Sequence, residues 1–135
     1  MHIVWTDDFV AGIDDIDRQH KELIVTYNEL VDACVGDGGP LRPAAVMNLL
    51  TGKIKAHTKA EEDLLAAHGY PLSEQHSSDH REFLRDVEDL EYRFMTGGDP
   101  GLKLGSLRSI GQKLVDHTKS DDVHGFEFLK SRMDL

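Results

Sequence analysis

The stretch from His57 to His80 constrains the fold more than any other part of the chain. His57 and Glu61 are four residues apart, and so are His76 and His80, with a Gly69-Tyr70-Pro71 break between the two pairs. Residues four apart lie on one face of an α-helix, and so short a break makes the flanking helices antiparallel neighbours. We therefore expect three imidazoles and a carboxylate to face one another across a helix–helix contact, which is the outline of a metal site.

Apolar residues recur every three or four positions along four segments, which predicts four amphipathic helices. The expected helices run from a cap at Asp14 or Asp15 to Cys34, from about Pro43 to Ala67, from a cap at Ser73 to Phe94, and from Leu104 to His117. An arm with Trp5 and Phe9 precedes them, and Phe126 to Met133 predict a short terminal helix. Short connections between such helices predict an all-α fold, an up-down-up-down antiparallel four-helix bundle, as a single domain over residues 1–135.

Charge and composition exclude several classes of partner. The chain has 25 acidic and 15 basic residues, a net charge of −10, which argues against nucleic acid or an anionic membrane as a partner. No apolar run approaches the roughly 18 residues that a membrane span needs.

Two features of the sequence bear on the compartment. The N-terminus lacks the pattern of a signal peptide. The single Cys34 cannot form an internal disulfide, which fits a reducing compartment. We therefore expect a cytoplasmic protein.

Polar residues interrupt the apolar stripe of every expected helix. Any one of them has an ordinary explanation, because a lone histidine on an apolar face is more often a core residue, and Glu61 could pair with Lys53 or Lys55. Together they predict a metal site, because burying them all without an ion would leave several polar groups seeking partners. Imidazole and carboxylate without thiolate suit iron, manganese or zinc, and seven ligands suit two six-coordinate ions better than one tetrahedral zinc. The candidate ligands are His20, His57, Glu61, His76, His80, His117 and either Asp121 or Asp122.

These residues give the chain a resemblance to a known family. The matching positions are Trp5, Phe9, Gly12-Ile13, Ile16-Asp17, Gln19-His20, His57, Glu61-Glu62, Tyr70-Pro71, His76, His80, Phe83, His117 and Asp122. In this pattern the chain resembles the hemerythrins, specifically the bacterial single-domain kind. The resemblance implies two iron ions, one held by His76, His80 and His117 and the other by His20 and His57. Glu61, Asp122 and an oxo or hydroxo group would bridge them.

The resemblance also implies a function. It leaves the His20–His57 iron one ligand short, and dioxygen would bind there reversibly, beside the apolar Leu114. We therefore expect a monomeric oxygen carrier, storage or delivery protein rather than an enzyme. The alternatives are an oxygen or redox sensor acting through a partner protein, and a di-iron oxidase or reductase of peroxide or nitric oxide. Lys113 and Thr118 stand where the family often has tryptophan and isoleucine, and both could change the lining of the pocket.

The carboxylate after His117 is ambiguous from spacing alone. Asp121 is at the regular helical spacing of four, whereas Asp122 would point about 140° away on an ideal helix. The family pattern selects Asp122, and this choice predicts a local widening or bend of the helix near Lys119. A regular α-helix through Asp122 would contradict it.

Several residues of suitable chemistry are not expected to bind metal. His2 and His68 should lie at the surface, and His124 at the surface or behind the ligands. Glu62 lies on a different face from Glu61, so we expect it to be solvated or in an ion pair. Cys34 falls on the first apolar stripe and should be a small core residue.

Overall fold

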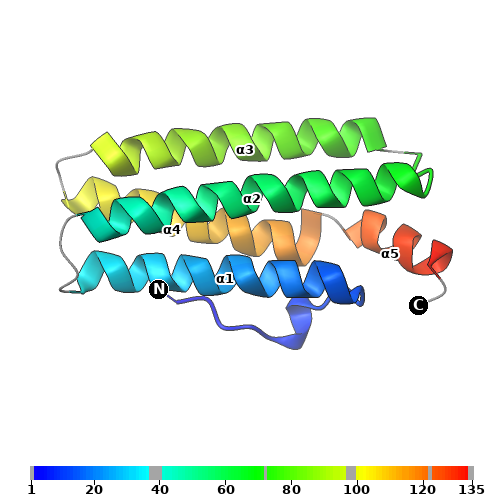
Figure 1. Ribbon diagram of the computed structural model, residues 1–135, viewed down its shortest axis with the longest axis horizontal. Coiled ribbons are helices and arrows are strands. Elements are labelled where there is room, and N and C mark those ends of the chain that lie inside the picture. Colours follow the sequence, from blue (N-terminus) through cyan, green and yellow to red (C-terminus); the bar gives the residue numbers. More distant parts are fainter. Residues whose placement is uncertain (1, 37–40, 72, 97–99, 122, 134–135) are drawn as a thin grey trace.

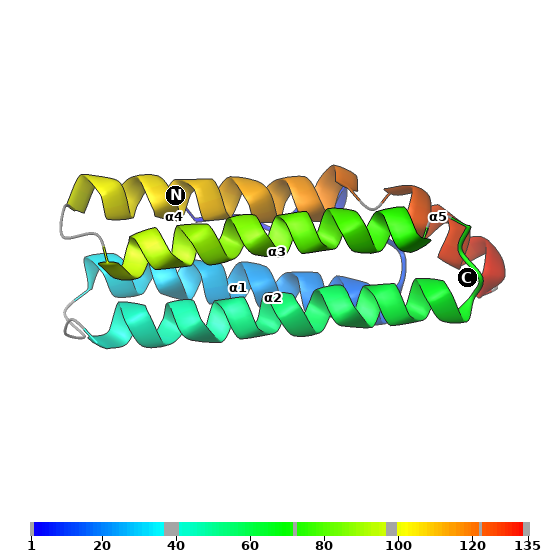
Figure 2. The same cartoon turned by 90° about the horizontal axis from the view of Figure 1, so that it is seen from above.

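Four long helices form the body of the molecule in the computed structural model (Figures 1 and 2). They are α1 (Asp14–Val35), α2 (Leu41–Ala67), α3 (Ser73–Thr96) and α4 (Pro100–Asp116). Each packs against the next, and α4 also packs against α1. The structure describes residues 2–36, 41–71, 73–96, 100–121 and 123–133, without the side chains of residues 41, 73, 100–102, 120, 121, 123 and 124. These residues include no strand, and the predicted all-α bundle is confirmed.

Two shorter helical elements lie at one end of this bundle. A π-helical segment, η2 (His117–Asp121), continues α4, and the short helix α5 (Val123–Arg132) follows it. Figure 1 shows α5 beyond the end of the long helices, beside the turn that joins α2 to α3. The predicted short terminal helix is thus confirmed. No helix within the described ranges is long and apolar enough to cross a membrane.

The start of α1 differs from the prediction. The helix begins at Asp14, and its N-cap residue Ile13 makes no side-chain cap, so the predicted cap at Asp14 or Asp15 is wrong. Asp17 instead reaches back to the arm, where its carboxylate accepts hydrogen bonds from the backbone N–H groups of Ala11 (2.7 Å) and Gly12 (3.2 Å). Gly12 has φ +84°, a conformation that glycine adopts without strain.

Two other helices start earlier than the apolar pattern indicates. The helix α2 begins at Leu41, which places Pro43 in its first turn, where a proline's missing N–H leaves no helical bond unmade. The helix α4 begins at Pro100, within the segment predicted to separate it from α3, and proline is favoured at a first helical position. The predicted cap at Ser73 lies outside the described side chains.

The N-terminal arm is fastened along α1. The Asn28 side chain accepts a hydrogen bond from the Ile3 N–H (2.8 Å) and donates one to the Ile3 carbonyl (2.9 Å). Trp5 stacks on Phe9, with ring centroids 5.4 Å apart. Lys119 of η2 lies over the Phe9 ring at 5.0 Å, so the 3-10 turn η1 (Asp7–Phe9) rests against the segment that follows α4.

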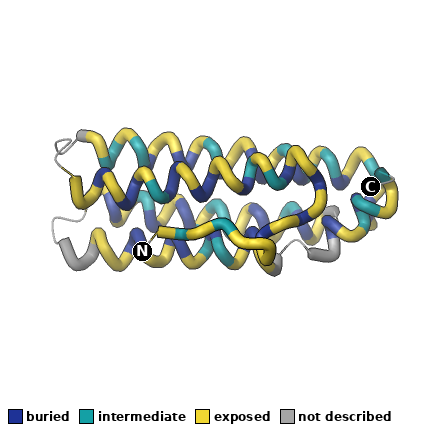
Figure 3. Tube along the Cα trace, turned by 90° about the horizontal axis from the view of Figure 1, so that it is seen from below, coloured by how far each residue is buried: buried dark blue, intermediate teal, exposed yellow. Residues whose placement is uncertain are grey.

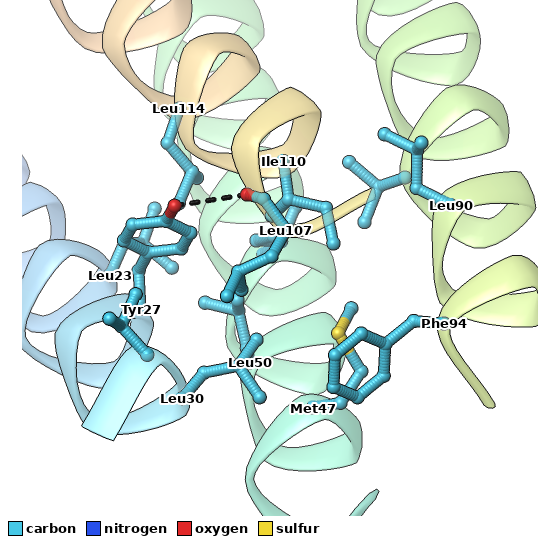
Figure 4. Packing of buried hydrophobic residues seen from close by; sticks show 13 residues of the cluster. Leu23, Tyr27, Leu30, Met47, Leu50, Leu90, Phe94, Leu107, Ile110 and Leu114 are labelled. Atoms are coloured by element: carbon cyan, nitrogen blue, oxygen red, sulfur yellow. Dashed lines mark hydrogen bonds between the residues drawn. The ribbon is translucent and has the colours of Figure 1, made fainter. Parts of the chain in front are cut away.

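The interior contains two apolar clusters with polar residues between them. The larger cluster, drawn in Figure 4, includes Leu23, Tyr27, Leu30, Met47, Leu50, Ile54, Val87, Phe94, Ile110 and Leu114. The smaller one, near α5, comprises Ala11, Ile13, Ile16, Leu65, Tyr70, Phe126 and Leu129. Along α1, His20 lies between Ile16 of one cluster and Leu23 of the other. Buried residues alternate with exposed ones along the helices in Figure 3, and six of the candidate ligands are buried: His20, His57, Glu61, His76, His80 and His117.

Three residues assigned to apolar stripes are at the surface instead. Leu49 is 49% exposed and Leu104 is 41% exposed, while the Cys34 thiol is also exposed. Each of them is next to a stripe position or near a helix end. Successive side chains on an α-helix point about 100° apart, so a neighbour of the stripe can face the solvent. Leu50 is buried beside the exposed Leu49, and Ala33 is buried beside the exposed Cys34. The prediction that Cys34 is a core residue is therefore wrong.

Candidate metal centre

Imidazoles from α1, α2, α3 and η2 converge on one carboxylate. Glu61 of α2 is 1% exposed, and its oxygens lie 2.7 Å from His57 Nε2 and 3.1 Å from His20 Nε2. His80 Nε2 of α3 and His117 Nε2 at the start of η2 lie 3.4 and 3.6 Å from the other carboxylate oxygen. The i, i+4 spacing of His57 and Glu61 produces the shortest of these contacts, as the sequence predicts.

The ligand atoms fall into two overlapping groups. His20, His57, Glu61 and His117 form one, and Glu61, His76 and His80 form the other, with the ligand atoms of each group within 4.8 Å of one another. Glu61 belongs to both, which is the geometry expected of a carboxylate between two ions. The resemblance assigns His117 to the ion of His76 and His80, whereas here its Nε2 lies 3.1 Å from that of His57.

Side chains outside the predicted ligand set fix the orientation of the imidazoles. His57 Nδ1–H donates to Gln19 Oε1 (2.7 Å), and His80 Nδ1–H donates to Glu62 Oε1 (3.2 Å). The Phe83 ring stacks on His117, with centroids 5.0 Å and planes 13° apart. The sequence predicts no role for Gln19, and it predicts only that Glu62 is solvated or in an ion pair. In the structure the partner of Glu62 is His80. This contact depends on how α2 and α3 are rotated against each other, which the sequence does not show.

Apolar groups close the end of the site. Phe126 of α5 meets His20 edge-on, with ring centroids 5.8 Å apart, and Tyr70 meets His76 in the same way at 6.3 Å. The approach of α5 is close at Gly125, where an added Cβ would lie 3.3 Å from Leu65 Cδ2. Leu114, fully buried, lies one turn before His117 on the other side. The candidate ligands whose side chains are described are at most 8% exposed.

The end of α4 changes its helical register at the ligand histidine. Residues His117–Asp121 are π-helical, so the predicted local widening near Lys119 is confirmed. A π-helix bonds residue i to residue i+5, which brings residues five apart toward one side. This is the spacing from His117 to Asp122. Asp122 itself lies outside the described residues, and so does the side chain of Asp121.

The two departures from the family pattern have local partners. Thr118 is buried, and its hydroxyl donates to the Leu114 carbonyl (2.8 Å), which satisfies a backbone oxygen where the helix changes register. Lys113 forms an ion pair with Asp86 of α3 (3.0 Å) and is partly exposed. Lys113 is therefore directed toward the surface rather than the ligands.

Comparison with known proteins agrees with this arrangement. A family model described as the hemerythrin HHE cation-binding domain matches residues 11–128. The chain belongs to the hemerythrin family. Its curated relatives include a bacteriohemerythrin of Pseudomonas aeruginosa, 36% identical over 122 residues, which are 90% of this chain and 78% of that protein. A bacteriohemerythrin of Stenotrophomonas maltophilia is 32% identical over 89% of this chain and 76% of its own length. A hemerythrin-like protein of Naegleria gruberi is 31% identical over 88% and 87%.

Burial and charge keep the hemerythrin ligands in the form that binds metal. Burial lowers the pKa of His117 to about 3, against the opposing effect of Glu61. Burial also lowers the pKa of His20 and of His76. Burial tends to raise the pKa of Glu61, but His117 and the other surrounding imidazoles outweigh it and hold that pKa well below its usual value. Neutral imidazole and ionised carboxylate are the states that coordinate cations.

A cation fits the unsatisfied atoms of this cluster. Glu61 Oε2 is buried and makes no hydrogen bond, and its nearest imidazole nitrogens are 3.4 and 3.6 Å away. An ion about 2.1 Å from each of two ligand atoms holds them roughly 3–4 Å apart. The separations around Glu61 therefore suit shared coordination. The donor set, imidazole and carboxylate, suits iron, manganese or zinc.

The metal-free hemerythrin chain is expected to lose stability as the pH falls. An imidazole whose pKa is lowered by folding takes up its proton in the unfolded chain first, so its contribution is complete above pH 6.5 and is lost toward its folded pKa, about 3 for His117. Because its folded pKa is also lowered, Glu61 likewise loses its contribution to stability as the pH falls below about 4.5. Each group lowers the free energy of unfolding by up to about 1.4 kcal/mol for each pH unit of acidification. Denaturant unfolding of the chelator-treated chain from pH 7 to pH 4 measures the slope. A His117→Leu chain should give a shallower slope, and equal slopes would contradict this assignment.

Proposed function

We propose that this hemerythrin domain holds a non-haem di-iron centre and binds dioxygen reversibly at one of the irons. The observation that supports it most is the position of Glu61, which is common to two groups of buried imidazoles. A carboxylate shared in this way is suited to bridging two ions.

The proposed ligand set follows the family pattern. His76, His80 and His117 would hold one iron, and His20 and His57 the other, with Glu61 and Asp122 between them. Three imidazoles would thus serve the first iron. Only two would serve the second, so that ion would have room for a further ligand. When bound, the iron pair supplies electrons that a dioxygen ligand can take up and return.

The chain's own contribution is to keep this position dry and the ligands fixed. Leu114 would line the open position, and Phe126 covers His20 from the side of α5. Such apolar walls limit the entry of protons, which favours release of dioxygen over irreversible oxidation of the metal. The π-helical segment η2 supports the choice of Asp122 as the second bridging carboxylate, because it turns the chain between the two ligands.

Iron analysis and visible spectroscopy test the proposal. The purified protein should contain two irons per chain after anaerobic loading. On admission of air it should develop a visible absorption band that disappears when oxygen is removed, through several cycles. Direct and permanent conversion to an oxidised spectrum would instead indicate a sensor or an oxidase or reductase. Failure to bind iron would overturn the proposal.

A further inference from the structure

Two imidazoles on opposite sides of Glu61 have their outer nitrogens held by unlike groups. His57 donates from Nδ1 to the side-chain amide oxygen of Gln19, across the α1–α2 contact. His80 donates from Nδ1 to the carboxylate of Glu62, across the α2–α3 contact. In both rings the inner nitrogen, Nε2, faces Glu61, at 2.7 Å for His57 and 3.4 Å for His80.

These outer contacts favour metal binding through Nε2. In the metal-free chain the Glu61 carboxylate, 2.7 Å from His57 Nε2, competes with Gln19 for the single proton of that neutral ring. When Nε2 binds an ion, the proton is on Nδ1, where Gln19 and Glu62 accept it. Gln19 and Glu62 thus orient their rings and select the tautomer that a ligand needs.

The two acceptors differ in charge. The Gln19 amide is neutral, whereas Glu62 is a carboxylate whose side chain is 29% exposed. A carboxylate draws the Nδ1 proton more strongly than an amide oxygen does, and so transfers more negative charge to the ring. An imidazole with more negative charge stabilises the more highly charged state of its metal.

We propose that Gln19 and Glu62 are positioning residues of the metal centre, and that their unequal charge makes the iron of His80 easier to oxidise than the iron of His57. This inference rests on the proposed di-iron function and deepens it. The charged acceptor, Glu62, would lie beside the ion that three imidazoles hold.

Three variants of the iron-loaded protein separate orientation from charge. Glu62→Gln keeps an acceptor oxygen but removes the charge, and Glu62→Leu removes both. Glu74→Gln is the matched control, because Glu74 lines the same surface hollow as Glu62. Iron release into a chelator reports orientation, and the midpoint potential of the centre reports charge.

We expect Glu62→Leu to release iron roughly 10-fold faster than the unaltered protein, as loss of an outer hydrogen-bond partner does in other metal sites. Glu62→Gln should retain iron and raise the midpoint potential by at least roughly twice the shift of Glu74→Gln, since only Glu62 acts through a charge-assisted hydrogen bond. Gln19→Glu should lower the potential. Equal shifts in Glu62→Gln and Glu74→Gln, or unchanged iron release in Glu62→Leu, would overturn the inference.

A measurement on the zinc-loaded chain keeps this inference separate from the proposed function, because zinc takes imidazole and carboxylate ligands and has no redox chemistry. Nitrogen-15 NMR should show His57 and His80 coordinated through Nε2 and protonated at Nδ1. Coordination through Nδ1 at either ring would overturn the inference even in a protein that binds iron. Absence of iron from the unaltered protein would overturn the proposed function, and the inference with it.

Discussion

Replacing Glu61 by glutamine is expected to empty the metal centre while leaving the helical bundle folded. Glu61 is the carboxylate that both groups of buried imidazoles share, so a neutral amide in its place weakens two coordination sites at once. Removal of an outer partner alone reduces metal affinity by 10–100-fold in comparable sites. Loss of a carboxylate common to both groups should reduce metal affinity by more than that, to beyond roughly 100-fold. The glutamine is nearly isosteric, so the apolar clusters on either side remain packed.

Iron content after anaerobic loading, together with far-ultraviolet circular dichroism, measures this effect. Glu88→Gln is the matched control, because Glu88 is a half-exposed residue of α3 that pairs with Lys55 at the surface. It should bind iron as the unaltered protein does. Full iron content in Glu61→Gln would contradict the role assigned to this carboxylate. Loss of helicity in Glu61→Gln would show that the residue is needed for folding rather than for the metal.

The apolar period predicts the bundle because burial of one stripe per helix decides the fold. It also predicts that His20, His57 and Glu61 are interior, since each interrupts such a stripe. Leu49 and Cys34 show the limit of this reasoning. The side chain of a residue next to the stripe points about 100° away from it. Whether that side chain is buried depends on how much of the helix surface the neighbouring helices cover. The spacing of apolar residues in the sequence does not specify this coverage.

Two features of the site cannot be predicted from the spacing of apolar residues: the choice of carboxylate after His117, and the side chains that contact the outer nitrogens of His57 and His80. Spacing alone favours Asp121 over Asp122, and only the family pattern selects the latter. The π-helical register at His117–Asp121 gives that choice a physical basis, because it alters the spacing along the backbone itself. The contacts of Gln19 and Glu62 with His57 and His80 depend on the rotation of neighbouring helices. For that reason the sequence predicts candidate ligands but not the groups that orient their rings.

Alanine substitutions at two glycines of α4 are expected to have opposite effects on stability. At Gly105 an added Cβ meets nothing within 4 Å, so Gly105→Ala should stabilise the protein by about 0.5–1 kcal/mol through helix propensity. At Gly111 the Cβ would lie 2.5 Å from the Tyr27 hydroxyl oxygen and 2.7 Å from Cζ of the same ring. Tyr27 is 1% exposed and donates a hydrogen bond to the Leu107 carbonyl (2.9 Å; Figure 4).

The buried ring of Tyr27 cannot move aside without losing that bond, because the larger apolar cluster surrounds it. Overpacking costs about 1–3 kcal/mol and a lost hydrogen bond about 0.5–1.5 kcal/mol. Gly111→Ala should therefore destabilise the protein by about 2–3 kcal/mol after the gain in propensity. Denaturant unfolding of both variants measures the difference. Adding Tyr27→Phe should recover part of the loss, since the hydroxyl is the nearest obstacle. Stabilisation by both alanines would mean that α1 and α4 pack less closely than Tyr27 and Gly111 require.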